Sequence, residues 1–265
     1  MRRFPLSVWG YALLLAILTS LPYVVGAGNT PDGWGYSGAA TLPDGAVVDY
    51  NSHMAKIWQG ARGQFDYHIL FTHEDHAGLP TVQGFYVALG AFAGLTSLDF
   101  ALAYHLARFI LTVIMVLAIW AFMSRYLEEI GERWAGTFFA TIVLGWSWIL
   151  FFIAPDLVIQ PERAPIELWL FDAYNLLGAF IMPHFAAVVI LQIIAFLTFD
   201  SWLKTPQPKH ILILTIVLLI DAIIQPYVVL MTFPIFGILT LHAVFIKRNI
   251  TIRQVIWLAI PAMAH

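Results

Sequence analysis

The sequence predicts an all-α protein, a polytopic bundle of transmembrane helices with two interfacial helices in a large first outer loop. Hydrophobic residues make up 60% of the 265 residues and charged residues only 11%, whereas soluble domains average about 25% charged residues. Several apolar runs also reach the roughly 20 residues needed to cross a hydrocarbon core of about 30 Å. Backbone polar groups in lipid must be satisfied internally, so these runs are expected to be helices.

The first apolar run covers residues 6–25 and follows the basic start Met1-Arg2-Arg3. A cleaved signal peptide is the alternative, because Val25-Gly26-Ala27 resembles a small-residue cleavage site. We favour an uncleaved anchor, since about 20 apolar residues exceed the usual core of a signal peptide.

The outer loop, residues 26–98, is expected to hold two helices that lie on the membrane. In residues 49–61, apolar side chains recur at 3–4 spacing on one face and polar side chains occupy another, which predicts an amphipathic surface helix. Residues 80–94 are apolar but too few to span, and they predict a second interfacial or re-entrant helix.

Further spans follow the loop. A continuous helix over the apolar run 211–246 would be about 54 Å long, well beyond the bilayer thickness, so we divide it at Gln225-Pro226. Pro183 predicts a kink within another span. The predicted spans are 100–123, 135–154, 173–199, 211–225 and 227–246, and another begins at 255.

The basic residues predict the orientation, because cytoplasmic loops carry an excess of Lys and Arg. A cytoplasmic N-terminus places nine of them inside and only three in outer loops. The outer loop and the Gln225 turn then lie on the outer face, as expected in a plasma (inner) membrane. The inner residues are Arg2, Arg3, Arg125, Arg133, Lys204, Lys209, Lys247, Arg248 and Arg253, and the outer ones are Lys56, Arg62 and Arg163.

The remaining composition excludes some functions. The chain has no cysteine, which excludes disulfides and thiolate metal sites. Its net charge of −3 comes without a basic patch, so we expect no nucleic-acid partner.

Asp49 is the leading candidate for chemistry, because it opens the predicted surface helix. Asp49 and His53 are one helical turn apart, so their side chains can touch. This spacing suits a catalytic base or metal ligand whose environment is set by its partner. The alternative, which is compatible with the first, is that Asp49 caps the N-terminus of the helix.

A second candidate is the run His73-Glu74-Asp75-His76, whose oxygen and imidazole ligands suit Mn, Mg or Zn. The spacing matches no recognised zinc pattern, and a solvated loop is the alternative. With Asp49 facing this run across a site, the candidate metal ligands are Asp49, His73, Asp75 and His76.

Polar residues inside predicted spans are functional candidates, because buried charge in a membrane is costly. Arg108, with His105 one turn earlier, could reach a phosphate near the outer headgroups; the alternatives are snorkelling or pairing within the bundle. Asp221 and Gln225, one turn apart, could contact substrate or pair between helices. The same choice applies to His184.

These motifs resemble the GT-C superfamily of membrane glycosyltransferases, which includes protein O-mannosyltransferases and other transferases that use polyprenyl-phosphate sugars. The likeness lies in the order of elements and in four stretches: Asp49 to Gly60, Gly78-Leu79-Pro80, Ala101 to Arg108, and the paired helices around Gln225-Pro226-Tyr227. Tyr50 replaces the usual second acidic residue. The family normally continues for several more helices, so residues 1–265 are expected to be one transmembrane domain from the N-terminal part of a longer protein.

The resemblance implies a glycosyltransferase of the cell envelope that moves a sugar from a polyprenyl phosphate to an acceptor on the outer face. Asp49 would be the general base or a carboxylate that orients the acceptor, and Glu74 or Asp75 a second carboxylate or a ligand for a divalent ion, Mg or Mn. Arg108 would bind the leaving phosphate. His53, His105, Asp221 and Gln225 would complete substrate binding.

Two other functions remain open. A non-catalytic membrane protein could bind polyprenyl lipid or scaffold envelope assembly. A transporter is the third possibility, although the single large outer loop and the lack of visible repeats argue against it.

Overall fold

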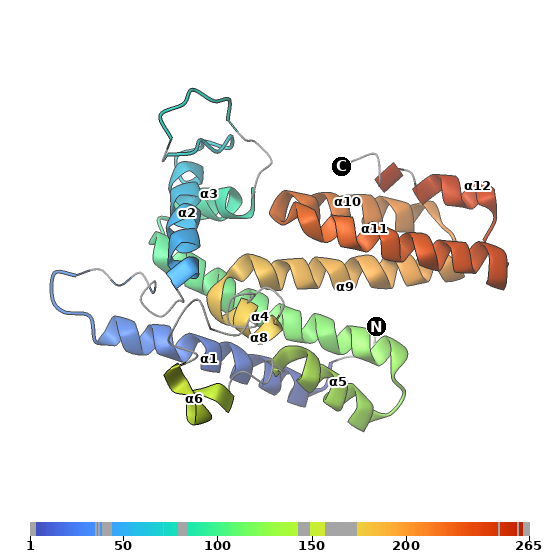
Figure 1. The fold of residues 1–265 in the computed structure, drawn as a ribbon, viewed down its shortest axis with the longest axis horizontal. Coiled ribbons are helices and arrows are strands. Elements are labelled where there is room, and N and C mark those ends of the chain that lie inside the picture. The colour runs from blue at the N-terminus through green and yellow to red at the C-terminus, as the bar shows by residue number, and fades with distance from the viewer. Residues whose placement is uncertain are drawn as a thin grey trace. The chain divides into compact units, whose positions relative to one another are not determined.

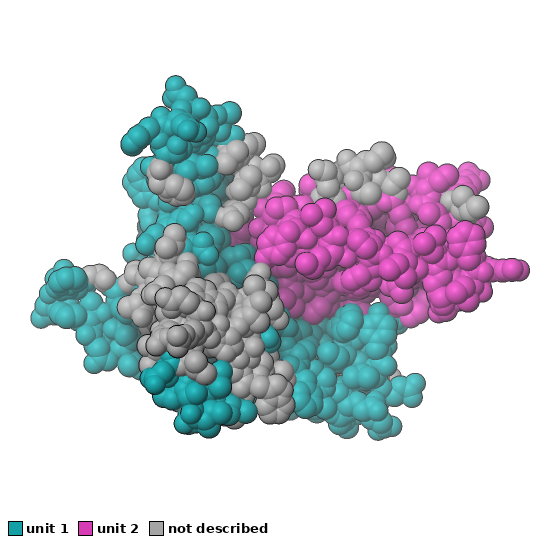
Figure 2. Space-filling view, in the orientation of Figure 1, with its two compact units in different colours: residues 1–78, 86–187 teal, residues 79–85, 188–265 magenta. Residues whose placement is uncertain are grey.

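The computed structural model describes residues 4–34, 36, 38, 44–70, 72–78, 84–142, 149–156, 174–248, 250–258 and 260–261. Its regular structure is helical, so the all-α prediction is confirmed (Figure 1). The chain divides into two compact units (Figure 2). Unit 1 comprises residues 1–78 and 86–187, and unit 2 comprises residues 79–85 and 188–265.

Within the described residues, four helices are long and apolar enough to cross a membrane. Three are α1 (Leu6–Gly28), α4 (Phe100–Tyr126) and α9 (Pro183–Lys204), and the fourth joins α11 (Pro226–Leu241) to the π-helix η6 (His242–Lys247). The other helices are α2 (Asp44–Gly60), α3 (Gly84–Thr96), α5 (Ile130–Ile142), α6 (Leu150–Ile153), α8 (Asn175–Ile181), α10 (Pro208–Ile224), α12 (Ile252–Val255) and the 3₁₀ turn η7 (Ile256–Leu258).

Two of the expected spans differ from the structure. The expected helix 173–199 is broken, because Met182 is extended (φ −136°, ψ 128°) between α8 and α9. Pro183 explains the break, since proline disfavours the helical conformation of the residue before it. In place of the expected helix 135–154, α5 begins earlier, at Ile130, and ends at Ile142, and residues 143–148 lie outside the described part.

Unit 1 is built on the pairing of α1 with α4, which lie side by side (Figure 1). Small side chains on α1 allow close packing against larger ones on α4. The opposite face of α1 exposes leucine and isoleucine side chains, as expected of a helix that faces lipid. The buried cluster consists of Val8, Ala12, Leu15, Ala16, Val113, Val116, Leu117 and Trp120.

Unit 2 contains the hydrophobic core formed by α10, α11 and most of α9. Phe199 of α9 stacks on Phe236 of α11, with ring centroids 4.0 Å apart and an interplanar angle of 6°. Trp202 is fully buried in the same cluster. The expected division of the long apolar run at Gln225-Pro226 is where α10 ends and α11 begins.

In unit 1, the backbones of α2 and α3 are in direct contact. A Cβ atom built on Gly90 would lie 2.1 Å from the carbonyl oxygen of Ile57, and one on Gly60 would lie 2.1 Å from that of Val87. Gly94 approaches the carbonyl of Ala61 in the same way. Only glycine permits this approach, so the three glycines set the distance between α2 and α3.

We therefore expect Gly90→Ala to destabilise the protein and lower its Tm in detergent, because the added methyl group must push α2 and α3 apart. Gly10→Ala is the matched control, since Gly10 is also helical but has no heavy atom within 4 Å of the added Cβ. That substitution should leave the Tm unchanged or raise it, because alanine favours the helix by up to about 1 kcal/mol. Equal effects of the two substitutions, measured by tryptophan fluorescence, would contradict the contact.

Candidate functional site

Helix α2 presents Asp49 on its exposed side and aromatic and aliphatic side chains on its buried side. Tyr50, His53 and Ile57 recur at helical spacing and are all buried. Helix α2 begins at Asp44, so Asp49 lies inside the helix. The interpretation of Asp49 as the N-terminal cap is therefore wrong. The predicted start at residue 49 was too late, because residues 44–48 show no clear helical spacing of apolar side chains.

Lys56, two turns further along α2, has an electrostatic effect on the pKa of Asp49. Partial burial raises the pKa of Asp49 above its usual value, and the positive charge of Lys56 lowers it by a smaller amount. Burial lowers the pKa of Lys56 to about 8, against the opposing effect of Asp49. A carboxylate and a buried amine therefore share this helix.

Lys56 is held in place by its neighbours. Its Nζ donates a hydrogen bond to the Ser52 hydroxyl at 3.2 Å and lies 5.2 Å from the ring centroid of Tyr67. The side chain is buried although lysine is seldom buried. The position of Lys56 on α2 is thus fixed by Ser52 and Tyr67.

His53 turns away from the exposed side of α2 and joins a buried cluster. Its ring stacks on Tyr86 of α3, with centroids 3.9 Å apart and an interplanar angle of 16°. The Tyr86 hydroxyl is hydrogen-bonded to Nδ1 of His184 at 2.7 Å. His184 lies in the first turn of α9, directly after the break at Pro183. Three helices of unit 1 therefore meet in the cluster His53–Tyr86–His184.

Burial gives His53 unusual chemistry. Burial first, and then His184 and Lys56, lower the pKa of His53 to about 2. The imidazole is therefore neutral at physiological pH. Its Nδ1 is buried and has no hydrogen-bond partner among the described residues. It can accept a hydrogen bond, but it carries no charge to offer a phosphate.

Tyrosines extend the cluster towards α4. Tyr50 packs edge-to-face on Tyr104, with ring centroids 5.0 Å apart. Tyr104 lies parallel to Tyr86 and donates a hydrogen bond to the carbonyl of Ile181 at 2.8 Å. The cluster thus joins α2 and α3 to the helix pair of unit 1.

Arg108 is used inside the bundle. The side chain is 1% exposed, and its Nη1 donates to the carbonyls of Thr19 at 2.9 Å and Ala179 at 3.2 Å. Nη2 donates to the Ser20 hydroxyl at 3.0 Å, and the guanidinium lies 4.4 Å from the Tyr23 ring centroid. The structure thus favours pairing within the bundle over a phosphate site, because Nη1 and Nη2 already have acceptors. The Nε of Arg108 is buried and has no partner among the described residues.

His105 lies on the same face of α4, and its ring is 4.5 Å from that of Tyr23. Tyr23 in turn donates a hydrogen bond to the carbonyl of Phe180 at 2.7 Å. The expected neighbourhood of His105 and Arg108 is therefore present, at the contact of α1, α4 and α8.

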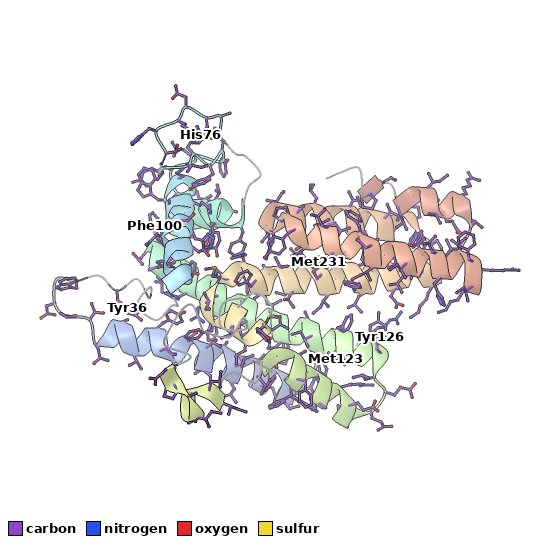
Figure 3. All side chains as sticks on the ribbon, viewed as in Figure 1. Tyr36, His76, Phe100, Met123, Tyr126 and Met231 are labelled. Carbon is purple, nitrogen blue, oxygen red and sulfur yellow. The ribbon has the colours of Figure 1, made fainter. Side chains whose placement is uncertain are left out.

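The run from His73 to His76 lies in the loop that follows α2 (Figure 3). His73, Glu74 and Asp75 are exposed. Both ring nitrogens of His76 are occupied: Nε2 accepts from the Ile69 amide at 3.2 Å and Nδ1 donates to the Ala77 carbonyl at 2.9 Å. These bonds fit the solvated-loop alternative.

The expected metal ligands are not assembled. Within the described part of the chain, no three His, Asp or Glu side chains lie close enough together to hold a metal ion. The structure therefore does not bring Asp49, His73, Asp75 and His76 into one ligand group. Catalytic roles for Glu74 and Asp75 stay predictions.

Asp221 and Gln225 lie in unit 2, at the end of α10. Asp221 is fully buried, and one of its carboxylate oxygens accepts a hydrogen bond from Gln192 of α9. The side chain of Gln225 is hydrogen-bonded to the Tyr227 hydroxyl. Asp221 thus pairs between helices, which is one of the two roles the sequence left open.

The tyrosines in the cluster leave little sign in the sequence. Tyr86 and Tyr104 lie in apolar runs, where a tyrosine is most simply interpreted as an interfacial residue. Lys56 shares a helix face with Asp49, and that spacing could have identified it. The pairing of Tyr86 with His184 joins residues far apart in the chain, and no local pattern signals it.

Comparisons with protein-family models, curated proteins and solved structures found no match to this chain. The structure accordingly supports a helical protein, with four helices in its described part that could cross a membrane, and no family assignment.

The buried neutral state of His53 predicts a pH-dependent stability. In the unfolded chain the imidazole titrates near pH 6.5, whereas the folded chain resists protonation down to about pH 2. The unfolded state therefore binds the extra proton as pH falls below 6.5, and the protein should lose about 2 kcal/mol of stability from this group by pH 5. His53→Phe, which keeps a ring against Tyr86, should flatten this part of the curve of Tm against pH. An unchanged slope would mean that His53 is accessible to protons in the folded state.

Proposed function

We propose that the protein is an integral membrane glycosyltransferase that moves a sugar from a polyprenyl-phosphate donor to an acceptor at the outer face of the membrane. The observation that carries the proposal is the exposed carboxylate of Asp49 on a helix whose other side is buried. The described part of the chain also has four helices long and apolar enough to cross a membrane, which suits a substrate that lives in lipid. The resemblance in sequence to the GT-C superfamily supplies the reaction class.

In the proposed reaction, Asp49 is the general base. Its carboxylate takes the proton from an acceptor hydroxyl or amine, whose oxygen or nitrogen attacks the anomeric carbon. The bond from that carbon to the phosphate oxygen breaks, and the polyprenyl phosphate leaves with the bonding electrons. The raised pKa of Asp49 suits this role, because a base works best when its pKa lies nearer the working pH.

Arg108 and the candidate metal ligands are the groups that the sequence offers for the leaving phosphate. Arg108 donates to the protein's own carbonyls and a hydroxyl, so its bonds offer the phosphate little. The candidate ligands for Mg or Mn do not fit such an ion as they stand, because they are not gathered. We therefore route no step through a metal. Lys56 is the positive group whose charge affects the pKa of Asp49.

Asp49→Asn should reduce transfer at least about 100-fold, because the amide cannot take the proton, while the Tm stays the same. Transfer would be measured in membranes with a panel of radiolabelled polyprenyl-phosphate sugars. Asp32→Asn is the matched control, since it removes an exposed carboxylate from the same segment between α1 and α4. Full turnover in Asp49→Asn would remove Asp49 from the mechanism.

A non-catalytic protein that binds polyprenyl lipid is the second candidate, and a cavity in unit 2 favours it. This cavity of about 420 Å³ lies between α10, α11 and the helical turns that follow, and its lining is almost wholly apolar, as a hydrocarbon chain requires. Lipid binding without turnover, unaffected by Asp49→Asn, would favour this function. The lining includes Leu214, Leu218, Phe233, Phe236, Leu241 and Leu258.

The proposal also requires Asp49 to lie outside the cell. Because the chain has no cysteine, single cysteines can report topology without background labelling. An impermeant maleimide should label Gln64→Cys in intact cells, and should label Glu132→Cys only after the membrane is opened. Both positions are exposed in the structure. The reverse pattern would place Asp49 in the cytoplasm and contradict the proposed orientation.

A further inference from the structure

Three helices of unit 2 share a buried polar chain. Asp221 of α10 is 0% exposed, and its Oδ2 accepts a hydrogen bond from Nε2 of Gln192 on α9. Oε1 of Gln192 accepts from the hydroxyl of Thr232 on α11 at 2.8 Å. This chain of hydrogen bonds holds the buried carboxylate at a defined place between the three helices.

Two buried oxygens at this place remain without a donor. Oδ1 of Asp221 and Oε1 of Gln225 are inaccessible to solvent, and neither accepts a hydrogen bond from any residue that the structure describes. A third oxygen is the carbonyl of Ala222, because Pro226 has no N–H to donate to the carbonyl four residues before it. The three oxygens come from the last turn of α10 and the residue that ends it.

The charge at this helix end is uncompensated. The C-terminus of a helix carries a partial negative charge, and Asp221 adds a full one when ionised. Among the residues described, no Lys, Arg or His forms an ion pair with Asp221. A buried ionised carboxylate is costly unless a positive charge joins it.

We infer that the C-terminal end of α10 binds a small monovalent cation of the Na⁺ type, with oxygens of Asp221, Gln225 and Ala222 as its ligands. Hard cations take oxygen ligands, and broken membrane helices offer their C-terminal carbonyls to such ions. One carboxylate matches one positive charge. The inference is independent of the proposed glycosyl transfer.

A proton on Asp221 would account for fewer of the unpaired oxygens than a bound cation does. A protonated Oδ1 needs an acceptor, yet Oδ1 and Oε1 of Gln225 are not hydrogen-bonded to each other. Protonation would leave the Gln225 and Ala222 oxygens as they are, whereas one cation can take all three. The other alternative is a polar network that merely holds three helices together, and it predicts no response to cations.

The test measures the Tm of the purified full chain in detergent, with choline chloride replaced stepwise by NaCl, KCl or LiCl at constant ionic strength. A bound ion stabilises the folded state by mass action, so Na⁺ should raise the Tm by about 5 °C in a saturable manner. Asp221→Asn should abolish this rise. The matched control is Asp200→Asn in the same unit, whose carboxylate already pairs with Lys204 at 2.8 Å, and it should keep the rise.

Gln225→Leu provides a second measurement that leaves the carboxylate in place. It should move the Na⁺ midpoint at least about tenfold higher, because one ligand oxygen is lost. This variant decides the matter if Asp221→Asn does not fold. The inference is overturned if the wild-type Tm is the same in Na⁺ and choline, if it responds to pH alone, or if Asp221→Asn retains the Na⁺ response.

Discussion

The rest of unit 1 depends on how the buried guanidinium of Arg108 is satisfied. A charged group inside an apolar bundle needs hydrogen-bond acceptors, and Arg108 finds them in the carbonyls of Thr19 and Ala179. These carbonyls belong to α1 and α8, so one side chain of α4 ties three helices together. The same rule, that polar groups must find partners inside the bundle, accounts for the bonds of Tyr23 and Tyr104 to the backbone around the α8–α9 break.

That break gives the candidate site its shape. The extended Met182 and Pro183 interrupt the helix, and His184 then enters the cluster with His53 and Tyr86. The glycine contact between α2 and α3 brings the rings of His53 and Tyr86 together. The buried face of α2 is thereby held on several sides, and its exposed face presents Asp49. A rigid helix that carries an accessible carboxylate is a suitable platform for the proposed chemistry.

In unit 2, the buried polar groups find only some of the partners that they need. Thr232 and Gln192 satisfy part of the Asp221 carboxylate, yet two buried oxygens at the end of α10 have no donor among the described residues. Arg108 has acceptors for Nη1 and Nη2, although its buried Nε has no partner among the described residues. At the end of α10, two unpartnered oxygens come from residues one helical turn apart, and these are the basis of the ion site inferred above.

The fold class, the helix break at Pro226 and the helix that carries Asp49 could be predicted from the sequence alone, because apolar run length, proline and helical spacing are local properties. The sequence also identified Arg108 and Asp221 as buried polar groups without showing their partners. The tertiary structure was needed to show that Arg108 is bonded within the bundle and that His53 faces Tyr86 and His184. It also shows that, among the described residues, Asp49 and the His73 run form no group of three metal ligands. These outcomes depend on contacts between residues far apart in the chain, such as Thr19 with Arg108, and no local spacing encodes them.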